Sequence, residues 1–141
     1  MSNTYNKFNQ FVADIANKNC NLGSDTLKVM LTNTLPVATN SQYSDISGTE
    51  VANGNGYTTG GVAASITSSM QTSGTYKLVL GQPVITATGA VGPFRYAVLY
   101  DSTPTTKTLI GWFDYGSSIS LANTDTFTIA FDGSAGALTI A

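Results

Sequence analysis

Short runs in which apolar and polar residues alternate recur along most of this chain, and they constrain the fold more than any other feature. In the first run, Leu27, Val29 and Leu31 occupy every second position, and such side chains lie on one face of a strand. The other runs cover residues 62–70, 75–80, 84–88, 94–101, 108–115, 126–132 and 137–140. Clusters of Gly, Pro, Ser and Thr separate them, so the sequence predicts short strands joined by turns.

About seven or eight such strands predict a mainly β fold, either an antiparallel β-sandwich or a Greek-key barrel. At 141 residues, the chain is predicted to form a single domain, residues 1–141. The sandwich is expected to span residues 25–141, because no linker or internal repeat indicates a second domain.

The segment 4–19 has a helical period instead. Phe8, Phe11, Val12 and Ile15 follow the spacing i, i+3, i+4 and i+7, which predicts one N-terminal α-helix with a single apolar face. That face would pack on the chain's own sheet or, if the segment is an arm, on a neighbouring subunit.

The longest connection between predicted strands is the loop of residues 34–56. Connections longer than about 12–15 residues without secondary structure are usually functional or disordered, so we expect this loop to contact a partner. The candidate contact residues are apolar or aromatic and lie in this loop, just beyond it or in the N-terminal segment: Tyr5, Phe8, Phe11, Val12, Leu35, Val37, Tyr43, Ile46 and Tyr57.

The stretch EVANGNGYTTGGVAA, residues 50–64, is rich in glycine. It lacks the Lys-Ser/Thr pair of a phosphate-binding loop, and the strand-like residues after it offer no helix N-terminus. The Asn-Gly pairs at 53–54 and 55–56 are suited to positive φ. We therefore interpret the stretch as turns that lead the long loop back into the sheet at Val62.

The composition limits the classes of function. Charged residues make up 10% of the chain, against about 25% in ordinary domains, and the net charge is −2. Because the few basic residues form no stripe, nucleic-acid binding is disfavoured. No apolar run approaches the roughly 20 residues that span a membrane, and no apolar core of a signal peptide is present.

The residues that most catalytic and metal sites need are scarce. The chain has no histidine and one cysteine, Cys20, which excludes imidazole and multi-thiolate sites. Asp101 and Asp114 lie at the ends of successive predicted strands, where they either form an acid–base pair or, as is commoner, cap turns. Asp125 and Asp132, together with nearby carbonyl oxygens, are oxygen ligands of the kind that calcium prefers, so a structural calcium site is an alternative role for them. We predict no enzymatic activity, no cofactor and no small-molecule substrate.

Two predicted strands are apolar on both faces. In residues 93–101, one face is expected to carry Phe94, Tyr96, Val98 and Tyr100. In residues 109–116, Phe113 and Tyr115 are expected on one face and Ile110 and Trp112 on the other. Burial on both sides is therefore expected, by a second sheet and by a helix or a subunit. A carbohydrate-binding aromatic platform is the alternative.

Five motifs occur together and in order: DTLKVMLTNTLP (25–36), GNGYTTGG (54–61), PFRYAVLYD (93–101), LIGWFDYG (109–116) and DTFTIAFDG (125–133). The set resembles a family of small virion structural proteins of tailed bacteriophages, of the head decoration or cement type. The resemblance covers nearly the whole chain after residue 20, and the ordered set is more specific than any single motif.

The resemblance implies a virion protein that is assembled in the host cytoplasm and lies on the outer capsid surface. Its implied partners are the major capsid protein and further copies of itself, commonly as a homotrimer. It would stabilise the shell by bridging capsid subunits. A tail or baseplate component and a carbohydrate-binding spike module are the alternative functions.

Overall fold

The computed structural model describes residues 5–141, and its described part is mainly β, as the sequence predicts. Its elements in chain order are β1 (Tyr5–Lys7), α1 (Phe11–Ala16), β2 (Leu27–Thr32), the 3-10 turns η1 (Tyr43–Asp45) and η2 (Ser47–Thr49), β3 (Val62–Ala64), β4 (Ile66–Thr72), β5 (Thr75–Leu80), β6 (Val84–Thr86), β7 (Val91–Asp101), β8 (Leu109–Leu121), β9 (Thr126–Thr128) and β10 (Leu138–Ile140).

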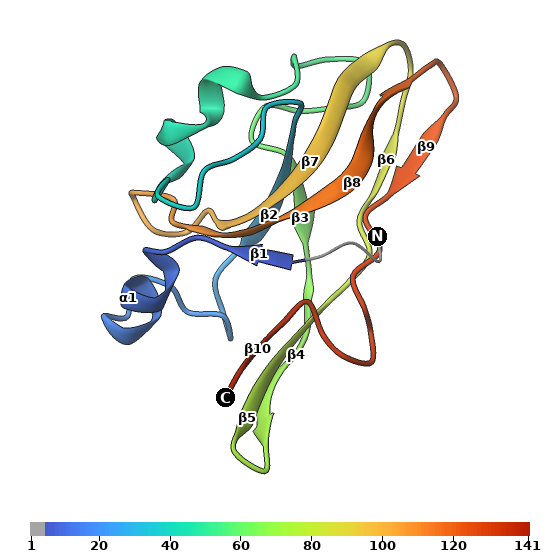
Figure 1. Cartoon of the computed structure of the whole chain (residues 1–141). Helices are drawn as coiled ribbons and strands as arrows, with labels where there is room; N and C mark the ends of the chain where they lie inside the picture. The colour runs from blue at the N-terminus through green and yellow to red at the C-terminus, as the bar shows by residue number, and fades with distance from the viewer. Residues whose placement is uncertain (1–4) are drawn as a thin grey trace.

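A five-stranded sheet with the order β1-β8-β7-β2-β3 forms the centre of the molecule (Figure 1). All of its neighbouring strands pair antiparallel. The long strands β7 and β8 form its central hairpin, whose turn contains Pro104 and closes through the Lys107 N–H bond to the Pro104 carbonyl, at 2.9 Å. β-Branched and aromatic residues are frequent in β7 and in the first part of β8, where Leu109–Phe113 are buried, which suits a pleated surface that is covered on both sides.

Two smaller sheets cover one face of the central sheet. One has the order β10-β5-β4 and the other is the ribbon β6-β9. The first core lies between the layers and joins Leu31 and Leu99 of the central sheet to Leu78, Ile85 and Phe127 of the smaller sheets. This layered, antiparallel arrangement is consistent with the predicted β-sandwich.

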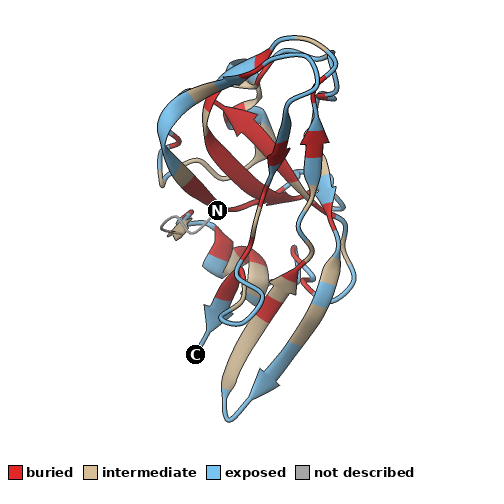
Figure 2. Ribbon diagram, turned by 90° about the vertical axis from the view of Figure 1, so that its right-hand side faces the viewer, coloured by how far each residue is buried: buried red, intermediate tan, exposed pale blue. Residues whose placement is uncertain are grey.

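The hairpin of β4 and β5 extends beyond this body (Figure 1). Its tip, at Ser73 and Gly74, is exposed (Figure 2). Both tip residues have positive φ, 52° and 84°, which a tight hairpin turn needs. Among the described residues of β4, Met70 is 62% exposed, so this projecting hairpin presents apolar surface to solvent.

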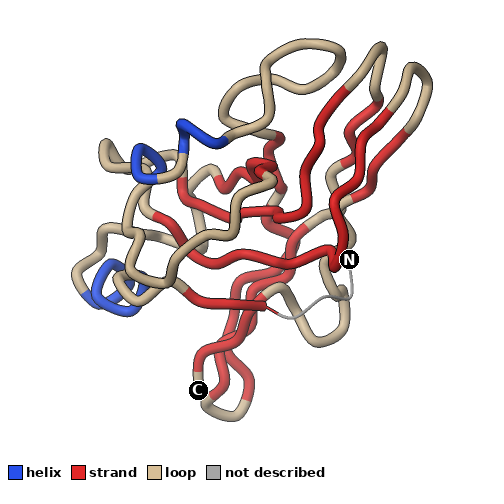
Figure 3. The backbone as a smooth tube through the Cα atoms, turned by 45° about the horizontal axis from the view of Figure 1, so that its top comes forward, coloured by secondary structure: helices blue, strands red, loops and turns tan. Residues whose placement is uncertain are grey.

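The opposite face of the central sheet is covered by the long loop after β2 (Figure 3). A second, smaller core lies there, with Met30, Val98 and Trp112 of the sheet packed under Ile46 of the loop. Strand alternation explains the division into two cores, because Met30 faces one core while Val29 faces the other. The sequence correctly indicates burial on both faces for most of the two strands, but Tyr115 of β8 is 42% exposed. A loop supplies the second cover.

Two predicted side-chain directions are wrong, and irregular pairing explains both. Phe94 faces the first core, whereas Tyr96 faces the second, because the register between β7 and β8 shifts between these residues. Ile110 lies in the first core with Phe113, not beside Trp112, because it is the extra residue where the β7–β8 register shifts again. One unpaired residue reverses the face of those beyond it.

The N-terminal helix is shorter than the predicted range 4–19. Tyr5–Lys7 instead form β1, which pairs with β8 at Gly111. A Cβ on Gly111 would lie 2.2 Å from the Tyr5 ring, so glycine allows this close pairing. The apolar stripe is also divided, because Phe8 packs in the second core and Phe11 in the first.

Candidate partner-binding surface

We call residues 33–61, which connect β2 to β3, the cover loop. Its backbone forms hydrogen bonds with three separate segments: β2, the turn between β7 and β8, and the residues after β1. Val51 N–H donates to the Leu31 carbonyl at 3.0 Å, and Tyr43 N–H donates to the Lys107 carbonyl at 2.9 Å. Asn9, beside β1, donates to the Ala38 carbonyl at 2.9 Å. The loop is therefore held along its length and forms a defined layer.

Glu50 is the main side-chain anchor of the cover loop. Its carboxylate accepts hydrogen bonds from the Tyr43 hydroxyl, from the Tyr57 hydroxyl at 2.6 Å and from the Gly60 N–H at 2.7 Å. Tyr57 is 2% exposed, and its hydroxyl also accepts the Leu31 N–H at 3.1 Å. One carboxylate thus joins η1, the glycine-rich turn and β2.

Tyr100 of β7 completes this network from below. Its hydroxyl donates to the Gly60 carbonyl, and its ring stacks on Tyr43 with centroids 5.0 Å apart. Burial raises the pKa of Tyr100 to about 12. Burial also raises the pKa of Tyr43 and Tyr57, and the adjacent Glu50 raises both further. All three phenols therefore stay protonated, as hydrogen-bond donors, at neutral pH.

The glycine-rich turn closes the cover loop against the sheet. Gly61 has φ of 89°, and a Cβ there would lie 1.9 Å from the Val29 carbonyl oxygen. Gly56 has φ of 98°, and its Cβ would lie 2.1 Å from the Thr86 carbonyl oxygen. These glycines serve positive φ and close backbone contact, as the turn interpretation of residues 50–64 predicts.

The outer side of the cover loop displays two apolar side chains. Leu35 is 59% exposed and Val37 is 56% exposed, whereas Pro36 between them is buried. Hydrogen bonds fix the segment, since Val37 N–H donates to the Asn40 amide oxygen at 2.9 Å and Ser118 donates to Asn33 at 2.6 Å. Leu35 and Val37 therefore form a small apolar surface on an ordered backbone.

The nine predicted partner contacts fall into groups by exposure. Val12, Leu35 and Val37 are exposed. Tyr5 and Tyr43 are half-buried. The others are buried in the two cores, so in this conformation their side chains offer no outer surface: Phe8, Phe11, Ile46 and Tyr57. The exposed pair of the cover loop, Leu35 and Val37, is therefore the best candidate for a partner contact.

The carboxylates considered for catalysis or calcium binding mostly serve the fold. Asp114 pairs with Arg95, at 2.8 Å, and this guanidinium holds the pKa of Asp114 below its ordinary value. Asp125 accepts the Ala122 N–H, and Asp132 accepts two backbone N–H groups at 2.8 Å. Asp101 is buried at the end of β7. Across residues 5–141, no group of three His, Cys, Asp or Glu side chains could hold a metal ion.

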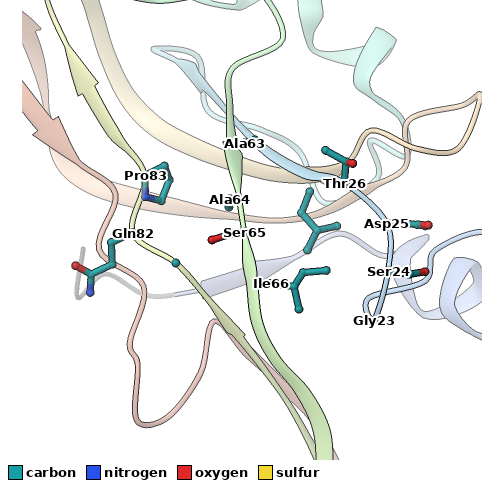
Figure 4. A pocket seen from close by; sticks show the side chains of 12 residues that line it. Gly23, Ser24, Asp25, Thr26, Ala63, Ala64, Ser65, Ile66, Gln82 and Pro83 are labelled. Atoms are coloured by element: carbon teal, nitrogen blue, oxygen red, sulfur yellow. The ribbon is translucent and has the colours of Figure 1, made fainter.

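Three hollows lie elsewhere on the surface, on the side of the smaller sheets. The first, of about 460 Å³, lies between residues 23–27, the junction of β3 and β4, and residues 81–83 (Figure 4). The second, of about 760 Å³, is lined by Ile15, Tyr76 and Ile140 among others. The third, of about 200 Å³, adjoins α1 and β10. The first has no aromatic lining residue on which a sugar ring could stack.

No protein-family model, curated protein or solved structure matches the chain. Within residues 5–141, no helix has the length and apolar character needed to cross a membrane.

Sequence reasoning missed Glu50 and Tyr100 as the residues that organise the surface. A signal was present, because Glu50 is the only glutamate of the chain and is the first residue of the glycine-rich stretch. Trp112, the residue considered for carbohydrate stacking, is 9% exposed and packs on Phe8 with ring centroids 4.8 Å apart. Its ring faces the second core, so it offers no platform for a sugar.

Proposed function

We propose that this protein is a capsid decoration, or cement, protein of a tailed bacteriophage. In this proposal it binds the outer surface of the head as a homotrimer and stabilises the shell by bridging major capsid subunits. The five ordered motifs support the assignment to a virion protein. The low charge content, 10% of residues, also fits, because such a surface has few ions to desolvate when a partner covers it.

The observation that carries the proposal is the apolar pair on the cover loop. Leu35 and Val37 are held outward by a backbone that is bonded to the sheet beneath it. A contact made by an ordered segment avoids the entropy cost of ordering a flexible loop. Asp45 is the only charged residue between residues 33 and 49, so the surrounding surface is polar but nearly uncharged.

The magnitude per copy is modest. Complete burial of a Leu or Val side chain contributes about 1.5–3 kcal/mol, so covering these half-exposed residues contributes about 1–2 kcal/mol each. A shell that binds many copies adds such contacts through multivalency. Decoration therefore needs no deep pocket in the partner, only a complementary apolar depression at each site.

The test uses heads that lack this protein, purified chain and a matched pair of variants. Leu35→Ser together with Val37→Ser should weaken binding about tenfold or more while the melting temperature stays unchanged. Val84→Ser is the control, because Val84 is a similarly exposed apolar side chain, at 51%, but belongs to β6 and not to the cover loop. If the double variant binds heads as tightly as wild type and the control, the cover loop is not the capsid contact.

Copy number separates capsid from tail. Hundreds of copies per virion, recovered with heads, would support decoration, whereas a small multiple of six, recovered with tails, would favour a tail or baseplate component. Virions that lack the protein should also release their genome at a lower temperature. Equal heat tolerance would remove the stabilising role from the proposal.

A further inference from the structure

A fully buried carboxyl group lies at the end of β7 and takes no part in the proposed capsid contact. Asp101 is 0% exposed, and one of its oxygens accepts the Thr103 N–H at 3.1 Å. Its Oδ2 has no hydrogen-bond partner among the described residues. Across the hairpin, the buried Thr108 hydroxyl also lacks an oxygen or nitrogen partner within residues 5–141, and the Cys20 thiol lies close to both groups. Two unpaired polar atoms at one end of a core need an explanation.

Within residues 5–141, no basic side chain forms an ion pair with Asp101. The connection between α1 and β2 brings the Cys20 thiol and the Asp25 carboxyl beside it. On β2, the residue paired with Asp101 is the apolar Leu27. The pKa of Asp101 is raised to about 7. Burial is the main cause and the neighbouring Asp25 adds to it, whereas the hydrogen bond to Cys20 lowers the pKa. Burial likewise raises the pKa of the Cys20 thiol, so it stays neutral.

The same corner fastens two segments of the chain together. Ser102 donates to the Thr26 carbonyl from its N–H at 2.9 Å and from its hydroxyl at 2.8 Å. Thr26 N–H donates to the Thr103 hydroxyl at 2.8 Å. Residues 21–26, which we call the latch segment, are thus held on the turn between β7 and β8, and Asp101 lies directly behind this contact.

The latch segment also borders open space. Residues 23–26 form one wall of the hollow of about 460 Å³, opposite Ala64 and Ile66 (Figure 4). The segment therefore has room to separate from the turn without displacing the packed core on the other side of β2.

We propose that Asp101 is a proton-operated latch. With its proton, the carboxyl is a neutral group that the buried corner tolerates, and the latch segment stays closed on the β7–β8 turn. Without its proton, it is an uncompensated anion beside a second carboxyl, and the latch segment opens to let water reach it. This inference is independent of the proposed capsid role.

The direction of the pH dependence follows from linkage. The pKa of Asp101 in the closed form is raised above the value of about 3.9 for a solvated aspartate. The closed form therefore binds its proton more tightly, and its extra stability is fully present below about pH 4 and is lost as the pH rises towards 7. In that window the opening equilibrium increases by up to about tenfold per pH unit, and above it the dependence levels off.

Hydrogen exchange of the intact chain tests the latch. After correction for intrinsic exchange, opening of residues 21–26 should be up to about a hundredfold more frequent at pH 7.5 than at pH 5. Asp101→Asn, which imitates the neutral form, should remove this difference. Asp132→Asn is the matched control, since it removes the same charge from an exposed turn and should keep the wild-type difference.

A wild-type chain whose latch segment exchanges equally at both pH values would overturn the proposal. So would an Asp101→Asn variant that keeps the full pH dependence. If Asp101→Asn does not fold, the carboxyl carbon of Asp101 in the wild-type chain can be titrated by NMR. A pKa near 4 there would refute the latch, and one near 7 with parallel changes in the amides of residues 21–26 would support it.

Discussion

Removal of the Glu50 carboxylate should destabilise the whole chain, because three donors lose their acceptor at once. A hydrogen bond to a charged group contributes about 1.5–3 kcal/mol, but Glu50 is only half-buried, so water can replace it at Tyr43. The other two donors are the Tyr57 hydroxyl, which is buried and stays unpaired, and the Gly60 N–H, which is half-buried and is only partly solvated by water. At about 1–3 kcal/mol for each of these two donors, Glu50→Ala should lower the free energy of unfolding by about 2–6 kcal/mol.

Urea denaturation followed by tryptophan fluorescence measures this loss. Trp112 is the only tryptophan of the chain and lies in the second core, which the cover loop shields. Glu50→Gln keeps one acceptor oxygen and should cost roughly half as much as Glu50→Ala. Asp45→Ala is the control, because Asp45 is an exposed carboxylate of the same loop that also accepts two backbone N–H groups, and such a cap contributes about 1 kcal/mol.

The reasoning fails if Glu50→Ala loses less than about 1 kcal/mol, the level of an ordinary cap, or no more than Asp45→Ala. That result would mean that the backbone hydrogen bonds alone hold the cover loop in place. The hydrogen bonds to the Glu50 carboxylate would then form because the loop is already ordered, and they would not stabilise it. A normal unfolding free energy with altered exchange only in residues 43–60 would lead to the same conclusion.

Three further changes test other parts of the structure by the same urea titration. Gly61→Ala should cost about 3 kcal/mol or more because its Cβ would overlap β2, whereas Gly74→Ala, with positive φ but open space around it, should cost about 1 kcal/mol. Phe8→Ala should cost about 3–5 kcal/mol, while Val12→Ala, exposed on α1, should stay within about 0.5 kcal/mol. Arg95→Ala should have only a small effect, and a smaller one in high salt, because its ion pair is partly exposed.

Local patterns were sufficient for much of the fold. The alternation at Leu27–Thr32 places alternate residues in different cores, and the predicted strand at residues 75–80 coincides with β5. The turn interpretation of the glycine-rich stretch is confirmed by Gly61. These features depend on residues close in sequence, because the local residue types alone determine the strand alternation and the positive φ of a glycine.

The misplaced features depend on distant partners. Tyr5 belongs to a strand only because β8 offers an open edge beside Gly111, and nothing in residues 4–19 records that edge. The faces of Phe94 and Ile110 depend on register shifts between β7 and β8, which alternation within one strand does not show. The cover loop has no period at all, because Glu50 and its tyrosine donors hold it in place of strand pairing.

The anchoring of the cover loop also bears on why its exposed residues are the better candidates for partner contact. Ordering a loop costs about 1–2 kcal/mol of backbone entropy per residue, and here the bonds to Glu50 and to the sheet already offset that cost within the fold. Pro36 is buried, but Leu35 and Val37 on either side of it are not, although both are as apolar as the core residues beneath. The exposure of these two apolar side chains on an ordered segment does not stabilise the chain itself. A partner that covers them gains their burial without having to order the loop.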